Sequence, residues 1–255
     1  MKNKILLFKN RSSVDAWLVQ IYKEQIKTKP HSVLGFATGT TPINFYKMLQ
    51  EDHQKNGTDW SKIVAFNLDE FVGIPIGHKE SFRTQMENNL YNGLNINIKN
   101  THLPDGMCID LSQEANNYEK LIKSKGGIDL QFITLGVNGH MAYNEPGTSL
   151  KTKTHVTGLT PATREEIVRQ GKFRTLEETP TAAITMGVKT IMNCKKVLMV
   201  IVGDNKATMA KKALEETPTA EIPASQLQKH KKCLFVMDED SAKLLDLTKH
   251  DVKRM

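Results

Sequence analysis

Five short apolar runs, each ending abruptly at glycine or polar residues, constrain the fold of this chain more than any other feature of its sequence. The runs are SVLGFA, KIVAFN, DLQFITL, KKVLMVIV and KKCLFVM, at residues 32–37, 62–67, 129–135, 195–202 and 231–237. Strands that are buried on both faces of a parallel sheet have this nearly continuous apolar character, whereas half-exposed strands alternate. The runs therefore predict the strands of one mostly parallel sheet.

Segments with the character of amphipathic helices separate these runs. Residues 41–55 have a proline just inside their start, residues 112–127 end in two glycines, and residues 205–216 resemble a third helix. Strands that alternate with helices are typical of an α/β fold with a doubly wound, mostly parallel sheet and helices on both faces. The sequence contains no internal repeat and no Gly/Ser-rich linker, so we expect a single domain over residues 1–255.

Composition and charge narrow the classes of function. Apolar residues make up 39% of the chain and charged residues 25%, as in globular proteins, and no apolar stretch approaches the length of a membrane span. The net charge is +7, but the lysines are scattered, which favours a small anionic substrate over nucleic acid. Three cysteines without a CxxC pair indicate a cytoplasmic protein with structural thiols.

Polar residues at the ends of the first two runs form a candidate anion site and a candidate base. FATGTTP, residues 36–42, places backbone N–H groups and threonine hydroxyls at the start of a helix, as a phosphate site does, although an ordinary threonine-capped turn has the same pattern. FNLDEFVG, residues 66–73, places Asp69 and Glu70 between two phenylalanines. Partial desolvation there would raise a carboxyl pKa towards that of a working base, while an exposed acidic pair is the alternative.

The segment LGVNGHMAYNEPG, residues 135–147, combines titratable side chains with glycines at the end of the third run. Glycines allow the backbone to approach a ligand closely, and His140 has a reference pKa suited to proton transfer at neutral pH. Glu145 is a candidate to orient and polarise that imidazole. Because ligands bind at the carboxyl ends of the strands in doubly wound sheets, we expect these three segments to meet at one edge.

These motifs, in this order and spacing, resemble the glucosamine-6-phosphate deaminase (isomerase) family. The resemblance is carried by ATGTTP, FNLDEFVG and GVNGHMAYNEPG and extends through TREEIVR, AAITMG, VGDNKA and IPASQLQKH over nearly the whole chain. It implies a Rossmann-like α/β fold. It also implies that an amino-sugar phosphate and water are converted to fructose 6-phosphate and ammonia, with no metal or organic cofactor.

The resemblance also implies catalytic roles for four residues. Asp69 would remove the proton at C2 and return it at C1, and His140 would serve the ring oxygen and the C1 hydroxyl. Glu145 and Asn138 would support His140. Some family members have aspartate at the position of Asn138, and the uncharged asparagine is expected to keep the pKa of His140 lower.

Four further residues are expected to bind the substrate phosphate, namely Thr40, Thr41, Arg169 and Lys206. The family's usual TGGTP is TGTTP here, so Thr40 adds bulk where the family has glycine. The segment VRQGKF departs from the family's pattern, which leaves Lys172 as the alternative to Arg169. The region at about residues 160–180 resembles the family's mobile lid, which excludes water from the open-chain sugar.

Several alternatives stay open at this point. A galactosamine-6-phosphate deaminase would differ only in the C4 epimer, a 6-phosphogluconolactonase would share the fold, and a non-enzymatic sugar-phosphate sensor domain would use a related one. The oligomeric state is open between a monomer and a homo-oligomer. Activation by an N-acetylated sugar phosphate is not expected, because His155 and Thr157 stand where activated relatives have cations.

Overall fold

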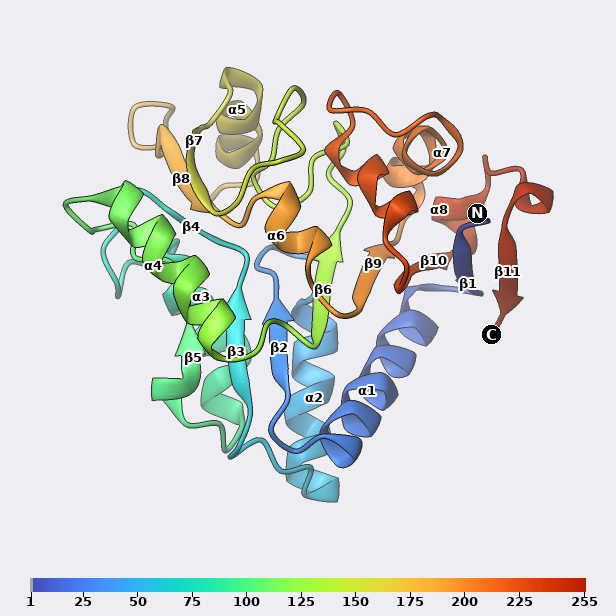
Figure 1. Ribbon diagram of the computed structural model, residues 1–255, viewed down its shortest axis with the longest axis horizontal. Helices are drawn as coiled ribbons and strands as arrows, with labels where there is room; N and C mark the ends of the chain where they lie inside the picture. The colour runs from blue at the N-terminus through green and yellow to red at the C-terminus, as the bar shows by residue number, and fades with distance from the viewer. Residues whose placement is uncertain (1) are drawn as a thin grey trace.

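The central element of the fold is an eight-stranded sheet whose neighbouring strands are all parallel (Figure 1). The structure, a computed structural model, describes residues 2–255. In spatial order the strands are β11 (Asp251–Arg254), β1 (Lys4–Phe8), β10 (Cys233–Asp238), β9 (Val197–Ile201), β6 (Leu130–Thr134), β2 (Val33–Phe36), β3 (Val64–Asn67) and β5 (Thr101–His102). All five apolar runs form strands of this sheet, and the predicted α/β, Rossmann-like fold is confirmed.

Helices cover both faces of the sheet, with α4 and α6 in front of it and α2 behind it in Figure 1. The helices are α1 (Arg11–Thr28), α2 (Ile43–Asn56), α3 (Phe82–Asn89), α4 (Leu111–Ser124), α5 (Pro161–Arg169), α6 (Val188–Met192), α7 (Ala207–Glu215) and α8 (Glu239–Ala242). Short 3-10 helices join them: η1 (Tyr91–Gly93), η2 (Ile98–Asn100), η3 (Asp204–Lys206), η4 (Pro223–Lys229) and η5 (Leu247–Lys249). Across residues 2–255, no helix combines the length and apolar character needed to cross a membrane.

The helix predicted from residues 41–55 begins later than its proline suggested. Pro42 occupies the N-cap position rather than the first helical turn, and α2 ends before Gly57, whose φ of 70° is left-handed. This left-handed glycine is the usual way to end a helix. Tyr46 of α2 donates its hydroxyl hydrogen to the carbonyl oxygen of Ala37 at 2.6 Å, which fixes the chain where it leaves β2.

The strand order reverses between β2 and β6. From β2 the chain extends to β3 and β5 on one side, and from β6 it extends to β9, β10 and finally β11, beyond β1, on the other. The loops that follow β2 and β6 therefore leave the sheet in opposite directions. Such a switch point opens a crevice at the carboxyl ends of the strands, where ligands of doubly wound folds bind.

A second, three-stranded antiparallel sheet stands beside this crevice. Its strands are β4 (Asp69–Phe71), β8 (Ala182–Thr185) and β7 (His155–Gly158). The sequence did not predict it, because the polar residues after β3 were interpreted only as the end of that strand. Leu68 joins the two sheets: its N–H donates to Phe36 O at 3.2 Å, and its carbonyl accepts from the N–H of Met186 at 2.7 Å.

Candidate active site

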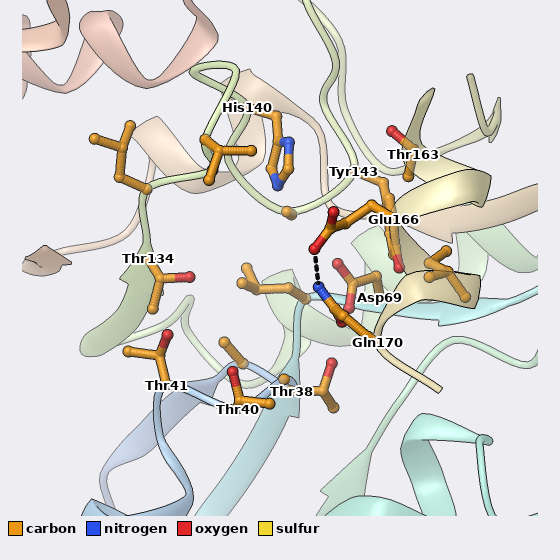
Figure 2. A pocket seen from close by; sticks show the side chains of 18 of the residues that line it. Thr38, Thr40, Thr41, Asp69, Thr134, His140, Tyr143, Thr163, Glu166 and Gln170 are labelled. Atoms are coloured by element: carbon orange, nitrogen blue, oxygen red, sulfur yellow. Dashed lines mark hydrogen bonds between the residues drawn. The ribbon is translucent and has the colours of Figure 1, made fainter. Parts of the chain in front are cut away.

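A cleft of about 420 Å³ opens at the carboxyl ends of β2 and β6. Its walls come from the loop after β2, the start of β4, the loop after β6, α5 with the residues that follow it, and Lys206. Figure 2 shows threonine side chains along one side of the cleft, His140 opposite them, and Asp69 beside Gln170 on a third side. Segments that are far apart in the sequence thus meet at the switch point of the sheet.

Asp69 is a buried carboxyl group facing this cleft. It is 6% exposed. Burial, together with the negative charge of the adjacent Glu70, raises the pKa of Asp69 to about 7, against a smaller opposing effect of the Lys172 cation. A carboxyl group with a pKa near neutrality is partly ionised at pH 7, so it can both accept and return a proton.

Glu70, unlike the adjacent Asp69, has a structural role. Its carboxylate accepts hydrogen bonds from the N–H groups of Phe71 (2.8 Å), Phe82 (2.9 Å) and Arg83 (2.9 Å) and from the hydroxyl of Ser81 (3.0 Å). Glu70 thereby ties β4 to the N-terminus of α3, where backbone N–H groups lack helical partners. Because successive side chains of a strand point to opposite sides, this anchoring leaves Asp69 directed into the cleft.

Asp69→Asn is expected to stabilise the folded protein, increasingly so as the pH rises from about 4 to 7. The native pKa of about 7 lies above the unfolded value of about 3.9, so the unfolded state releases its proton first and wild-type stability falls across this window. Asparagine does not titrate and avoids this loss, which amounts to roughly 1–4 kcal/mol above pH 7. Urea unfolding of the wild type and of Asp69→Asn at pH 5 and pH 8 measures the difference in their free energies of unfolding. A stability difference that is the same at both pH values would contradict the buried, uncompensated state of Asp69.

The loop after β6 is shaped around the imidazole of His140. The N–H of Gly136 donates to the carbonyl oxygen of His140 at 2.9 Å, and a Cβ added at Gly136 would lie only 2.4 Å from the imidazole ring. Gly139 has a left-handed φ of 90°, and Ala142 has a φ of 52°, which is unfavourable for a residue other than glycine. The glycines that the sequence pointed to therefore allow the histidine ring to pack against backbone.

Glu145 lies behind His140 and is held from two directions. Its carboxylate accepts a hydrogen bond from Asn138 Nδ2 at 2.7 Å and another from Thr163 Oγ1, on α5, at 2.5 Å. Its Oε2 is 4.0 Å from His140 Nδ1. Burial lowers the pKa of His140, while Glu145 raises it and Lys206 adds to the lowering. The imidazole is consequently neutral at pH 7 and able to accept a proton from a ligand.

The opposite end of the cleft offers hydroxyl groups and a cation. Thr40 and Thr41 lie there at the N-terminal end of α2, with Thr38 and Thr134 beside them (Figure 2). Lys206 lines the same cleft, and burial lowers its pKa. Hydroxyls, a helix N-terminus and a lysine are suited to an anion such as phosphate.

The two candidate cations of the segment after Thr160 differ in their surroundings. Arg169 lies at the end of α5 with 78% of its side chain exposed, and its guanidinium pairs with Glu166. Lys172 is more deeply placed: burial lowers its pKa, and the charges of Glu80 and Asp69 oppose that shift. Both line the cleft, and the geometry favours Lys172 as the cation that faces its interior.

Several residues that line the cleft were not selected from the sequence, namely Thr38, Thr134, Tyr143, Thr163, Glu166 and Gln170. Three of them lie on or next to α5, in a segment whose weak periodicity hid its helix. Thr160 caps α5 by accepting from the N–H of Thr163 at 3.2 Å, and Pro161 follows it. This threonine–proline pair is the signal of a helix start that the sequence offered.

Comparison with known proteins places the chain in a family. The family model for glucosamine-6-phosphate isomerases and 6-phosphogluconolactonase matches residues 10–236. The chain belongs to this family. Among its members, the glucosamine-6-phosphate deaminase of Mycoplasmopsis pulmonis (strain UAB CTIP) is 46% identical over 244 residues, which cover 95% of each protein.

Solved structures of the same family agree with the fold. The structure of a monomeric glucosamine-6-phosphate deaminase matches with a TM-score of 0.91 at 33% identity, covering 95% of this chain and 100% of that one. A 6-phosphogluconolactonase from Thermotoga maritima matches with a TM-score of 0.73 at 20% identity, covering 93% of this chain and 100% of the other. The lactonase therefore shares the fold alone, while the deaminases are similar in sequence as well.

Proposed function

We propose that this chain is a glucosamine-6-phosphate deaminase, which converts glucosamine 6-phosphate and water to fructose 6-phosphate and ammonia. The observation that carries the proposal is the shared cleft of Asp69, whose pKa is raised to about 7, and the neutral His140. A carboxyl group with a pKa of about 7 and a neutral imidazole suit a reaction that moves protons at different atoms of one sugar. The 46% identity to a named deaminase supports the same conclusion.

The phosphate end of the cleft positions the sugar for reaction. Thr40, Thr41 and Lys206 bind the phosphate, with Lys172 as the cation contributed by the lid and Arg169 at the rim. Binding energy at the remote phosphate is used to place the reacting carbons beside Asp69 and His140.

His140 opens the sugar ring. Its neutral imidazole takes the proton of the C1 hydroxyl and delivers a proton to the ring oxygen as the C1–O5 bond breaks, which leaves a carbonyl at C1. Glu145 stabilises the transient imidazolium, and Asn138 and Thr163 keep that carboxylate in place. Ring opening comes first, because only the carbonyl makes the C2 proton acidic.

Asp69 then moves a proton from C2 to C1. Asp69 removes the C2 proton and the ammonium group on C2 gives up a proton to the C1 oxygen, which yields an enolamine with a hydroxyl at C1. Return of the proton from Asp69 to C1 then gives a protonated imine at C2. Water adds to that imine, and ammonia leaves to give the ketone of fructose 6-phosphate. A single carboxyl group with a pKa of about 7 can perform both transfers.

Ammonia release from glucosamine 6-phosphate and galactosamine 6-phosphate, measured side by side with the purified protein, tests the proposal. We expect the glucosamine epimer to be the preferred substrate. If ammonia is released from galactosamine 6-phosphate alone, the protein is a galactosamine-6-phosphate deaminase instead. Hydrolysis of 6-phosphogluconolactone without ammonia release from either sugar would contradict the proposal.

Lys206→Ala is expected to raise KM about 10- to 100-fold, because a charge-assisted contact with phosphate contributes roughly 1.5–3 kcal/mol. Lys172→Ala is expected to raise KM more than Arg169→Ala does, since Arg169 is largely exposed. Lys211→Ala, an exposed lysine on α7, serves as the control. If Arg169→Ala has the larger effect, then α5 closes over the phosphate with Arg169 turned inward.

We also propose that one chain, folded as a single domain over residues 1–255 with residues 160–180 as its lid, carries a complete site. One chain brings Asp69, His140 and Lys206 together in a single cleft, and a structurally similar deaminase is monomeric. Homo-oligomer formation and the cytoplasmic location stay predictions. Sedimentation at several protein concentrations, with activity measured in parallel, tests whether the monomer is active.

A further inference from the structure

Glu166 is an acidic residue of the cleft that the proposed mechanism leaves without a role. It lies on α5, and Figure 2 shows its carboxylate in the cleft between His140 and Asp69. Gln170 Nε2 donates a hydrogen bond to its Oε1 at 2.9 Å, and Arg169 pairs with its Oε2. Arg169 at the end of α5 and Gln170, the residue that follows it, thus help to fix the direction of this carboxylate.

A second carboxylate is unexpected in a cleft built for a phosphate ester. Among the described residues, Asp69 and Glu166 are the acidic side chains that line it, and the basic ones are His140, Arg169, Lys172 and Lys206. A carboxylate repels an anionic ligand unless it meets a cationic group of that ligand. An amino-sugar phosphate has one such group, the amine on C2, which resembles an α-amino group with a pKa of about 7.7–8.0.

We propose that Glu166 binds the 2-ammonium group of the substrate and thereby selects amino sugars over sugars with a hydroxyl at C2. This inference rests on the proposed function. Asp69 acts on the hydrogen of C2, and His140 acts at C1 and the ring oxygen, so a group located between them faces the C1–C2 edge of the sugar. The amine is bonded to that same C2.

The competing explanation is that Glu166 only orients Arg169. The two explanations differ in which ligands they affect. Contact with the phosphate is common to every sugar 6-phosphate, whereas contact with an ammonium group exists only for an amino sugar. A pair of ligands that differ only at C2 therefore separates them.

The experiment measures binding by calorimetry at pH 7 with two open-chain ligands that have no carbonyl and cannot react, 2-amino-2-deoxyglucitol 6-phosphate and glucitol 6-phosphate. Glu166→Gln is expected to weaken binding of the amino ligand about 10- to 100-fold, as for loss of a charge-assisted contact, and to leave the hydroxyl ligand at its wild-type affinity. Glu166→Asp, which keeps the charge, is expected to restore part of the preference. Glu165→Gln removes an exposed carboxylate from the same helix and is the matched control.

Other outcomes overturn the inference. Equal weakening of both ligands by Glu166→Gln assigns Glu166 to the orientation of Arg169, and unchanged binding of both leaves it no part in recognition. A wild-type protein that binds neither ligand contradicts the proposed function itself. A wild-type protein that binds both ligands with equal affinity overturns only the inference that the cleft selects the ammonium group. The thermal midpoint of each variant verifies that it is folded.

Discussion

Asp69→Asn is expected to lower kcat for glucosamine 6-phosphate by about 10²–10⁴-fold, the usual contribution of a positioned general base. The amide is nearly isosteric with the carboxyl group but cannot accept the C2 proton. Because Asp69 acts on the C2 hydrogen and is not one of the groups proposed to bind the phosphate, affinity for the unreactive ligand 2-amino-2-deoxyglucitol 6-phosphate is expected to change little. A fall in kcat without a fall in binding is the pattern of an interaction made in the transition state.

Exchange of the C2 hydrogen with solvent deuterium measures the proton-transfer step directly. Wild-type protein is expected to exchange it during turnover, and Asp69→Asn is expected to lose this exchange. Asp240→Asn, an exposed carboxylate on α8, is the control for a change of charge alone. Rapid exchange in Asp69→Asn would contradict the assignment, since another group would then be the base. In the wild type, kcat/KM is expected to fall below pH 7 as Asp69 becomes protonated.

The central sheet was predictable because its strands carry their own signal. Runs such as KKVLMVIV are apolar on both faces, and a strand covered by helices on each side needs that composition. The second sheet has no comparable signal. β4 is three residues long and acidic at its start, and β7 has the half-exposed sequence HVTG. Their pairing with β8 comes from tertiary contacts, which local sequence patterns do not encode.

The site was predictable where the chemistry is local in sequence. His140 and Glu145 lie five residues apart in one loop, and their contact follows from the turn that the glycines allow. The hydrogen bond from Thr163 to Glu145 joins residues 18 positions apart, and it depends on where α5 packs. The position of Lys172 likewise depends on the turn after α5, so sequence alone left Arg169 and Lys172 as alternatives.

His140→Asn is expected to lower kcat/KM for the ring-closed substrate by about 10²–10⁴-fold, because ring opening then lacks its proton carrier. Glu145→Gln is expected to have a smaller effect, of about 10- to 100-fold, because its carboxylate does not face the cleft and acts by orienting and polarising the imidazole. Both variants keep a polar side chain in place. Their thermal midpoints verify that the loop after β6 is still formed.

The double variant separates an indirect role of Glu145 from an independent one. If Glu145 acts only through the imidazole 4.0 Å away, its removal has no further effect once His140 is gone, so the double variant and His140→Asn are expected to have the same kcat/KM. If Glu145 itself transfers a proton to the sugar, the two losses multiply. Its hydrogen bonds from Asn138 and Thr163 favour the first outcome, since they engage both carboxylate oxygens and hold the group outside the cleft, beside His140. If the two losses multiply, the proton transfer of ring opening is assigned to Glu145 instead of His140. Glu145 would then have to turn into the cleft when substrate binds.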